Sequence, residues 1–324
     1  MTDTRAISDQ SAPPSMKPGV VLALSVFGLS WAAPLIRLST ASPLVIAAWR
    51  LVFAESVLIA ILLWRGEWRA WRALSSRDHV IAAGAGVMLA LHFWSWNASL
   101  AYTTVAASVV LVNLQPAIVV VGSVLLLGEH ATARQLSGVT VGILGALLVA
   151  APAILGSASA AGLATSAPFG MPPRIFGDVL ALIGAVTASL YYLAGRRLRA
   201  TLDLVPYVGL VYGWCMLALV AVGVATGARF GPFGLTDWGI FAGLAAGPML
   251  LGHTGMNWAL RHLPAPVVNL TVLGEPVGAS LLAMLIPAIG ERPDAWTIVG
   301  GSCILMGAVW ALGGTRAAPA TEGM

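Results

Sequence analysis

Charged residues are scarce in this sequence. Only 9% of its 324 residues are Asp, Glu, Lys or Arg, and 58% are hydrophobic. A soluble domain typically carries about 25% charged residues. A water-soluble fold of this length cannot hide so much apolar surface, so the chain requires lipid as its solvent. The shortage of charge therefore excludes an ordinary soluble enzyme or soluble binding domain.

Several kinds of functional site are also missing. The two cysteines, Cys215 and Cys303, both lie in apolar segments, and two are too few for a metal or redox site. There is no GxSxG, HExxH or Walker motif. The net charge of +4 comes from short loops, without the basic stripe of a nucleic-acid binder. The sequence thus predicts no enzyme activity, no cofactor, no metal and no nucleic-acid partner.

Long apolar runs dominate what is present. A bilayer core about 30 Å thick needs roughly 20 apolar residues per helix, and the runs have this length. They predict an all-α integral membrane protein with ten transmembrane helices, at residues 19–38, 43–64, 79–101, 104–127, 134–155, 177–198, 204–226, 237–260, 264–288 and 295–314. Very short connections, such as 39–42, require their flanking helices to be antiparallel.

The basic residues predict the orientation of these helices. With the N-terminus in the cytoplasm, the inner segments hold twelve of them: Arg5, Lys17, Arg65, Arg69, Arg72, Arg77, Arg134, Arg196, Arg197, Arg199, Arg261 and Arg316. The outer segments hold four: Arg37, Arg174, Arg229 and Arg292. This bias places both termini in the cytoplasm.

Parts of the sequence recur 160 residues later. Pro116 corresponds to Pro276 in this way, and Val112 corresponds to Val272. Five spans are an odd number, so a second copy must cross the membrane in the opposite direction. Inverted repeats of this kind occur in secondary transporters, with the substrate site near the midplane. The predicted organisation is a tail at 1–18, one repeat at 19–155, a linker at 156–176, the second repeat at 177–314 and a tail at 315–324.

Several stretches resemble the drug/metabolite transporter superfamily, specifically its EamA-type ten-helix members. They are SPLVIAAWR at 42–50, the segment 97–149, GDVLALIGAVTASLYYLAGRRL at 177–198 and NWALRHLPAPVVNLTVLGEPVGASLLA at 257–283. Arg50 and the Glu275–Pro276 pair match common family features, whereas Pro287 interrupts a run that is usually unbroken. The many tryptophans are most similar to the YddG-type exporters of aromatic amino acids. The resemblance implies a multi-pass transporter of the bacterial inner membrane, compatible with a monomer.

Two prolines follow polar residues within apolar runs. Glu275 precedes Pro276, and Gln115 precedes Pro116 at the equivalent place in the repeat. A charge at mid-bilayer costs roughly 2.5 kcal/mol or more, so Glu275 is a candidate proton carrier or counter-ion for cargo. Alternatively, it only caps a helix or pairs with an arginine. Each proline predicts a helix kink, and broken membrane helices line cavities, so we expect both polar residues to face one cavity.

Polar residues also recur along the third and eighth predicted spans. His92 and Trp96 share one helix face, as do His253 and Asn257, and Asn97 is the repeat mate of Asn257. We predict that all five line the cavity. The alternatives are that the asparagines join helices, for about 0.6–2 kcal/mol, and that the histidines are hydrogen-bonded packing residues.

Aromatic residues lie deep in several spans, where they suit flat, apolar or cationic cargo. These are Trp31, Trp94, Trp96, Tyr191, Tyr192 and Trp214. Trp96 and Tyr191 are the predicted cargo contacts, and ordinary packing is the alternative. Arg50 and Glu55 share the second span about 140° apart, so we expect each to find a partner on another helix. Glycines in the fifth and tenth spans predict close helix packing and a scaffold role.

The predicted function is a secondary transporter that exports amino acids, aromatic ones favoured, or related small metabolites by alternating access. Anionic cargo such as nucleotide sugars is an alternative, but it requires several basic residues in the cavity and only Arg50 is available. A non-transporting membrane sensor or an intramembrane enzyme is the alternative from another functional class.

Overall fold

A computed structural model describes residues 17–127, 132–155, 164–199, 201–259, 268 and 271–312. These residues form helices and connecting segments, and no strand occurs among them, which confirms the predicted all-α class. Several predictions fall outside these ranges: both tails except Lys17 and Pro18, residues 156–163 of the linker, and Arg261.

The helices follow one another along the chain with short connections. The first half contains α1 (Pro18–Ser30), α2 (Ala32–Leu38), α3 (Pro43–Arg65), the 3-10 helix η1 (Glu67–Ala73), α4 (Ser76–Ser99), α5 (Val105–Val112), α6 (Gln115–Leu127) and α7 (Ala133–Ile154). The second half contains η2 (Pro168–Gly170), α8 (Pro173–Arg199), α9 (Leu204–Ala225), α10 (Leu235–Leu244), the π-helix η3 (Ala245–His253), α11 (Thr254–Ala259), α13 (Glu275–Leu285) and α14 (Ala295–Leu312).

Within the described part of the chain, seven helical stretches are long and apolar enough to cross a membrane. They are Pro18–Leu38, Pro43–Arg65, Ser76–Ser99, Val105–Gly122, Ala133–Pro152, Pro173–Gly195 and Leu204–Ala225. The predicted eighth span corresponds to α10, η3 and α11, the ninth is only partly described, and the tenth contains a shorter apolar helix. The chain is therefore a multi-pass membrane protein, and the count of ten helices stays a prediction.

Two helices are interrupted just before the prolines that were expected to kink them. The first interruption is a turn at Asn113 and Leu114, after which Gln115 and Pro116 begin α6. The second is a turn at 273–274, after which α13 begins. Proline suits the first turn of a helix because it has no N–H to leave unbonded and its φ is already helical. The two breaks lie 160 residues apart, in agreement with the offset seen in the sequence.

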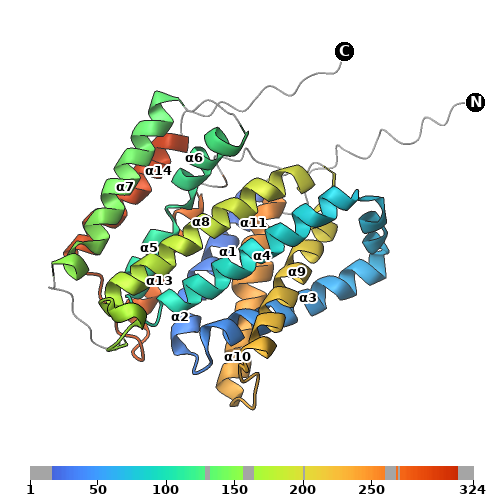
Figure 1. Ribbon diagram of the computed structural model, residues 1–324, viewed down its shortest axis with the longest axis horizontal. Coiled ribbons are helices and arrows are strands. Elements are labelled where there is room, and N and C mark those ends of the chain that lie inside the picture. Colours follow the sequence, from blue (N-terminus) through green and yellow to red (C-terminus); the bar gives the residue numbers. More distant parts are fainter. Residues whose placement is uncertain are drawn as a thin grey trace, which may run out of the picture.

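The helices α7 and α14 lie side by side at one edge of the bundle (Figure 1). A Cβ atom added to Gly145 would lie 2.5 Å from the Gly300 carbonyl oxygen, and one added to Gly138 would lie 2.5 Å from that of Gly307. The two backbones therefore touch directly. This contact agrees with the close packing predicted for the fifth and tenth spans.

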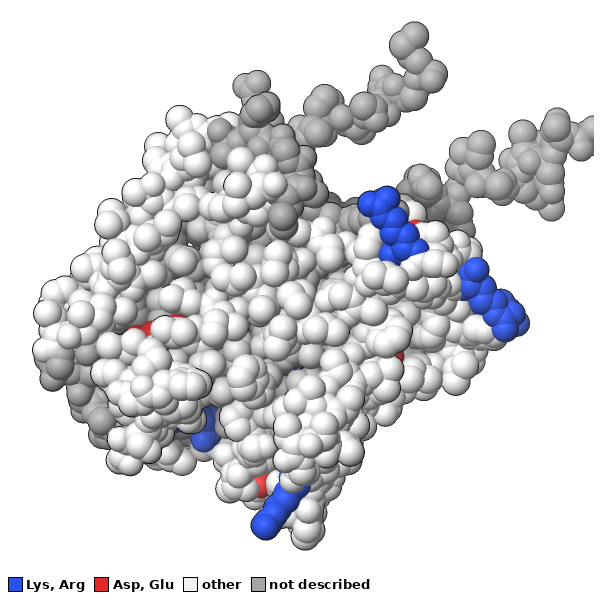
Figure 2. All heavy atoms as spheres, viewed as in Figure 1, with Lys and Arg blue, Asp and Glu red and all other residues white. Residues whose placement is uncertain are grey.

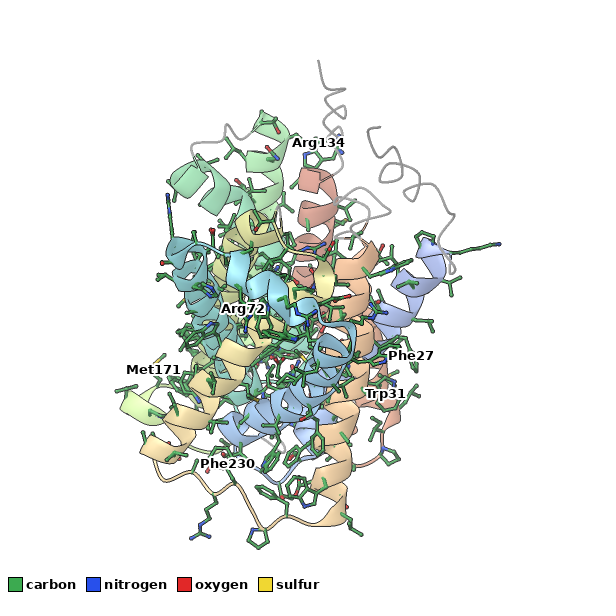
Figure 3. The ribbon with its side chains drawn as sticks, turned by 90° about the vertical axis from the view of Figure 1, so that its right-hand side faces the viewer. Phe27, Trp31, Arg72, Arg134, Met171 and Phe230 are labelled. Carbon is green, nitrogen blue, oxygen red and sulfur yellow. The ribbon has the colours of Figure 1, made fainter. Side chains whose placement is uncertain are left out.

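Most of the other extensive helix contacts join the two halves of the chain. Helix α4 packs along α8 and α9, α3 packs along α9, and α1 packs along η3. The visible face in Figure 2 is largely uncharged, with basic side chains near its upper right and lower margins. Arg134 and Phe230 lie at opposite ends of the molecule in Figure 3. This distribution fits helices that run between two aqueous phases through lipid.

Polar contacts tie together the end of the bundle that the basic residues assign to the outside. Arg37 Nη2 pairs with Glu291 Oε1 at 2.7 Å, and the Val105 N–H donates to Glu291 Oε2 at 2.7 Å. Asp237 accepts hydrogen bonds from the hydroxyl groups of Ser39 and Thr40, each at 2.6 Å. We call these contacts of Glu291 and Asp237 the outer latch.

A second ion pair lies near the latch. Arg174 Nη2 contacts Asp294 Oδ2 at 2.8 Å, and the Thr297 N–H donates to Asp294 Oδ1 at 2.7 Å. Partial burial alone would raise the pKa of Asp294, but the Thr297 N–H and Arg174 outweigh it and lower that pKa. The carboxylate therefore stays ionised near neutral pH and closes the start of α14 against α8.

The sequence anomaly at Pro287 coincides with the end of a helix. Helix α13 ends at Leu285, and Ile286 adopts an extended conformation with ψ 112°. A residue that precedes proline is disfavoured in the helical region, which explains this early end. The short segment that follows brings Glu291 back towards α5, where it forms the latch.

Candidate functional site

A cavity of about 60 Å³ lies where the two interrupted helices meet α1, α4, α8 and η3. Its lining residues are Leu29, Ala32, His92, Trp96, Val112, Asn113, Gln115, Tyr192, His253, Met256, Val272 and Glu275. Five of the eight residues predicted to line a cavity are therefore brought together. They come from four separate predicted spans. The sequence alone could not show that these four spans meet at one cavity.

The polar wall of the cavity is built at the two helix breaks. Asn113 ends α5 and its amide nitrogen donates to the Val109 carbonyl oxygen at 2.9 Å. Its side chain also forms a hydrogen bond with Glu275. On the equivalent half-helix, Gln115 is hydrogen-bonded to the Tyr192 hydroxyl group. Glu275 and Gln115 each open a short helix, whose N-terminal dipole favours a negative charge in the cavity.

Aromatic rings form another part of the lining. The rings of His92 and Trp96 are stacked, with centroids 6.1 Å apart and planes at 7°. His92 Nδ1 lies 2.9 Å from the Gly184 carbonyl oxygen. Since a carbonyl oxygen only accepts, Nδ1 must donate, which leaves Nε2 as an acceptor in the neutral ring. The buried Trp96 Nε1 has no hydrogen-bond partner among the described residues, so its N–H is available to a ligand.

Three predicted cavity residues lie elsewhere. Asn97 donates to the Pro43 carbonyl oxygen at 3.1 Å, and Asn257 donates to that of His253 at 2.9 Å. The Asn97 bond joins α4 to the start of α3, which was the alternative for asparagine, whereas Asn257 bonds within its own helical run. Tyr191 is 4% exposed and packs in the core beside Tyr207, to which it is hydrogen-bonded. Tyr192 takes its place at the cavity, because one residue along a helix turns the side chain by about 100°.

The aromatic residues predicted deep in the spans do not form one cluster. Trp94 and Trp214 are each 39% exposed on the outer surface of the bundle. Trp31 packs edge-on against Phe27 with ring centroids 6.3 Å apart, and both lie at the right-hand margin of Figure 3. The sequence could not reveal this, because a lipid-facing surface and a buried one are equally apolar.

Arg50 lies behind the cavity and not in its lining. It is fully buried, with its guanidinium carbon 4.0 Å from the centroid of the Phe93 ring and Nη2 3.0 Å from Met249 Sδ. Phe93 in turn meets the His253 ring edge-on at 6.1 Å. Arg50 and Glu275 attract each other electrostatically, although they form no ion pair in the described structure. The guanidinium thus influences the site from behind an aromatic layer.

Among the described residues, no group of three or more His, Cys, Asp or Glu side chains could hold a metal ion. The site instead offers one carboxylate, two amides, a phenol and an indole N–H within an apolar enclosure. Such a set of groups binds an organic molecule through directed hydrogen bonds. The carboxylate suits a cationic group of that molecule, and the rings suit its flat groups.

Comparison with known proteins identifies the family. The model of the EamA-like transporter family matches residues 18–151 and again 175–313. The chain belongs to the EamA-like transporter family. This membership confirms the resemblance to the drug/metabolite transporters at the level of the superfamily.

Relatives of this EamA-like protein are named as transporters. The pseudopaline exporter CntI of Pseudomonas aeruginosa is 28% identical over 297 residues, which cover 91% of this chain and 95% of the exporter. The uncharacterized transporter YyaM of Bacillus subtilis is 22% identical, over 85% of this chain and 86% of its own. A solved crystal structure shares the fold at a TM-score of 0.58 and 20% identity, covering 91% and 96% of the two chains. The protein is thus a membrane transporter of the drug/metabolite type.

Proposed function

We propose that this protein is a secondary transporter that exports amino acids, aromatic ones favoured, or related small metabolites. The observation that carries this proposal is the cavity at the two helix breaks, which Glu275, Gln115 and Asn113 line together with the stacked rings of His92 and Trp96. Broken helices within a membrane are tolerated where they line a cavity, and transporters use such breaks to bind substrate. A carboxylate opposite aromatic rings complements an amino group next to a flat side chain.

We propose further that the two halves are inverted repeats that move against each other. The family model matches each half separately, and the helix breaks are 160 residues apart. The helix contacts support the same symmetry, because α4 against α8 and α1 against η3 are exchanged when the halves are exchanged. In this scheme both termini lie in the cytoplasm of a bacterial cell and the chain spans the inner membrane.

The size of the cavity suggests a closed state in the transport cycle. A cavity of about 60 Å³ holds a few water molecules. Pockets for small organic ligands measure about 300–1,000 Å³. Cargo therefore enters only after the halves separate at one end. The outer latch holds the outer end shut, so in this scheme loading begins from the cytoplasmic side, as export requires.

The direct test is reconstitution of the purified protein into sealed liposomes with a panel of labelled amino acids. We expect an aromatic amino acid to cross the membrane, and Glu275→Gln to weaken its transport about tenfold or more. That figure corresponds to loss of a charge-assisted hydrogen bond of about 1.5–3 kcal/mol. Glu67→Gln is the matched control, because Glu67 pairs with Arg65 on the surface, where it is 33% exposed.

Two results would refute this proposal. Equal transport by the wild type and Glu275→Gln for every cargo would remove the cavity carboxylate from the mechanism. Solute conversion by the protein in detergent, without a sealed compartment, would favour an intramembrane enzyme. The pseudopaline exporter among the relatives makes pseudopaline the next cargo to test.

A further inference from the structure

A second buried carboxyl group lies outside the cavity. Glu55 sits near the middle of α3 and is 2% exposed. Its Oε2 atom is buried without a hydrogen-bond partner among the described residues, and no ion pair there includes Glu55. Glu55 does not line the cargo cavity. The proposed transport mechanism therefore leaves this group without a role.

Glu55 faces α9, which belongs to the other half of the chain. A Cβ atom added to Gly213 would lie 3.4 Å from Glu55 Oε1, so this glycine leaves the space that the carboxyl group occupies. The Leu62 side chain packs over Gly209 one turn further along the same interface. The Glu55 carboxyl group is thus enclosed between two helices that the proposed alternating-access cycle would move against each other.

Few ionisable groups surround this carboxyl group. From α9, the buried thiol of Cys215 interacts with both Glu55 and Arg50, and the same helix carries the buried phenol groups of Tyr207 and Tyr212. On α3 itself, Arg50 contacts Phe93 and Met249 and forms no ion pair with Glu55 in the described structure. The ionisable groups of the other elements packed on α3 lie towards its ends or at the cavity: Arg77, Asp78, His79 and His92 of α4, Glu67, Arg69 and Arg72 of η1, Asp237 of α10 and His253 of η3.

We propose that Glu55 is a proton-binding site, separate from the cargo cavity, and that its proton is the coupling ion for export. An ionised carboxylate is strongly disfavoured where it has neither a cation nor a donor, so the enclosed group holds a proton. When α3 and α9 separate, water reaches the carboxylate. The proton then leaves to that water, and one is taken up from the opposite side in the other state. This coupling rests on the proposed transport function.

The proton site can be tested without any cargo. Infrared difference spectra of the purified protein in lipid report the carbonyl stretch of each protonated carboxyl group. We expect a band at neutral pH that is absent from Glu55→Gln and still present in Glu275→Gln and Glu67→Gln. Glu55→Gln should also unfold at the wild-type temperature, because glutamine replaces a neutral carboxyl group of the same shape. If the wild-type and Glu55→Gln spectra are identical, Glu55 carries no proton and the proposal fails.

Coupling requires a transport measurement with the labelled amino acid that the wild type moves. With one proton per cargo, a gradient of one pH unit drives about a tenfold cargo gradient. We expect Glu55→Gln to reach equal concentrations on both sides and still to exchange labelled for unlabelled cargo. Glu55→Asp should retain the accumulation.

The outcomes separate the two proposals. Accumulation by Glu55→Gln that equals the wild type would show that another group couples the proton. If the wild type moves no amino acid of the panel, the cargo assignment fails while the infrared spectra still decide whether Glu55 binds a proton. Loss of exchange as well as accumulation in a folded Glu55→Gln protein would also contradict a role limited to coupling.

Discussion

Arg50 shows how a single buried charge can be tolerated within the bilayer. Its Nε and Nη1 atoms are buried and have no hydrogen-bond partner among the described residues. The ring of Phe93 and the sulfur of Met249 are its close contacts. A cation held in this way is stabilised by a π-face and a polarizable sulfur. Its long-range attraction to Glu275 is therefore more important to the site than to the fold.

This assignment predicts a separation between stability and transport at Arg50. Replacing a buried charge with an apolar side chain of similar volume is often neutral or stabilising. We expect Arg50→Met to unfold at or above the wild-type temperature but to transport poorly. Arg50→Ala should unfold earlier, because deletion of a large buried side chain costs about 2–5 kcal/mol. Thermal unfolding in lipid and uptake by liposomes measure the two effects. A Met variant as unstable as the Ala variant would instead show that the charge supports the fold.

At the scale of the helices, the sequence predicts where a helix is interrupted better than it predicts which face of a helix lines the cavity. Proline after Gln115 and Glu275, with the shared offset, predicts the two disrupted sites and the polar residues beside them. The choice between Tyr191 and Tyr192 could not be predicted. Helix α8 contacts α4, α5 and α6, so neighbouring side chains on it meet different helices, and only the packing decides which of the two tyrosines lines the cavity. The same limit misplaced Trp94 and Trp31.

The α7–α14 contact gives a matched prediction with glycine to alanine substitutions. Gly145→Ala places a methyl group 2.5 Å from the Gly300 carbonyl oxygen, so the helices must separate, at a cost of about 1–3 kcal/mol. Gly84→Ala in α4 meets nothing within 4 Å and should gain about 1 kcal/mol from helix propensity. Thermal unfolding of both variants measures the difference. Equal effects would mean that α7 and α14 are not in backbone contact in the membrane.

Across the whole molecule, the described polar contacts between the halves are concentrated at the predicted outer end. Glu291 joins α2 to α5 through Arg37 and the Val105 N–H, and Asp237 holds the segment between α2 and α3. The ion pair is 14% exposed on both sides. Pairs this enclosed are screened less by solvent than surface pairs, so breaking one has a measurable effect.

The latch therefore predicts a charge-reversal result. We expect Arg37→Glu to place two carboxylates together, open the outer end and make nearby positions accessible to a water-soluble thiol reagent. A reporter cysteine at Ala283, which is 1% exposed and lies next to Glu291, detects this opening in a background without Cys215 and Cys303. Adding Glu291→Arg should restore the pair and much of the protection. If the double variant is as accessible as the single one, Arg37 and Glu291 do not hold the outer end closed.

The glycine contact between α7 and α14 has one more consequence. Because the two backbones interlock at Gly138, Gly145, Gly300 and Gly307, neither helix has room to slide past the other. We expect α7 and α14 to move as one rigid unit while the remaining helices tilt relative to them. Spin labels placed on α7 and α14 would then keep a constant separation under every condition. This constant distance provides an internal reference for measuring the displacement of the other helices.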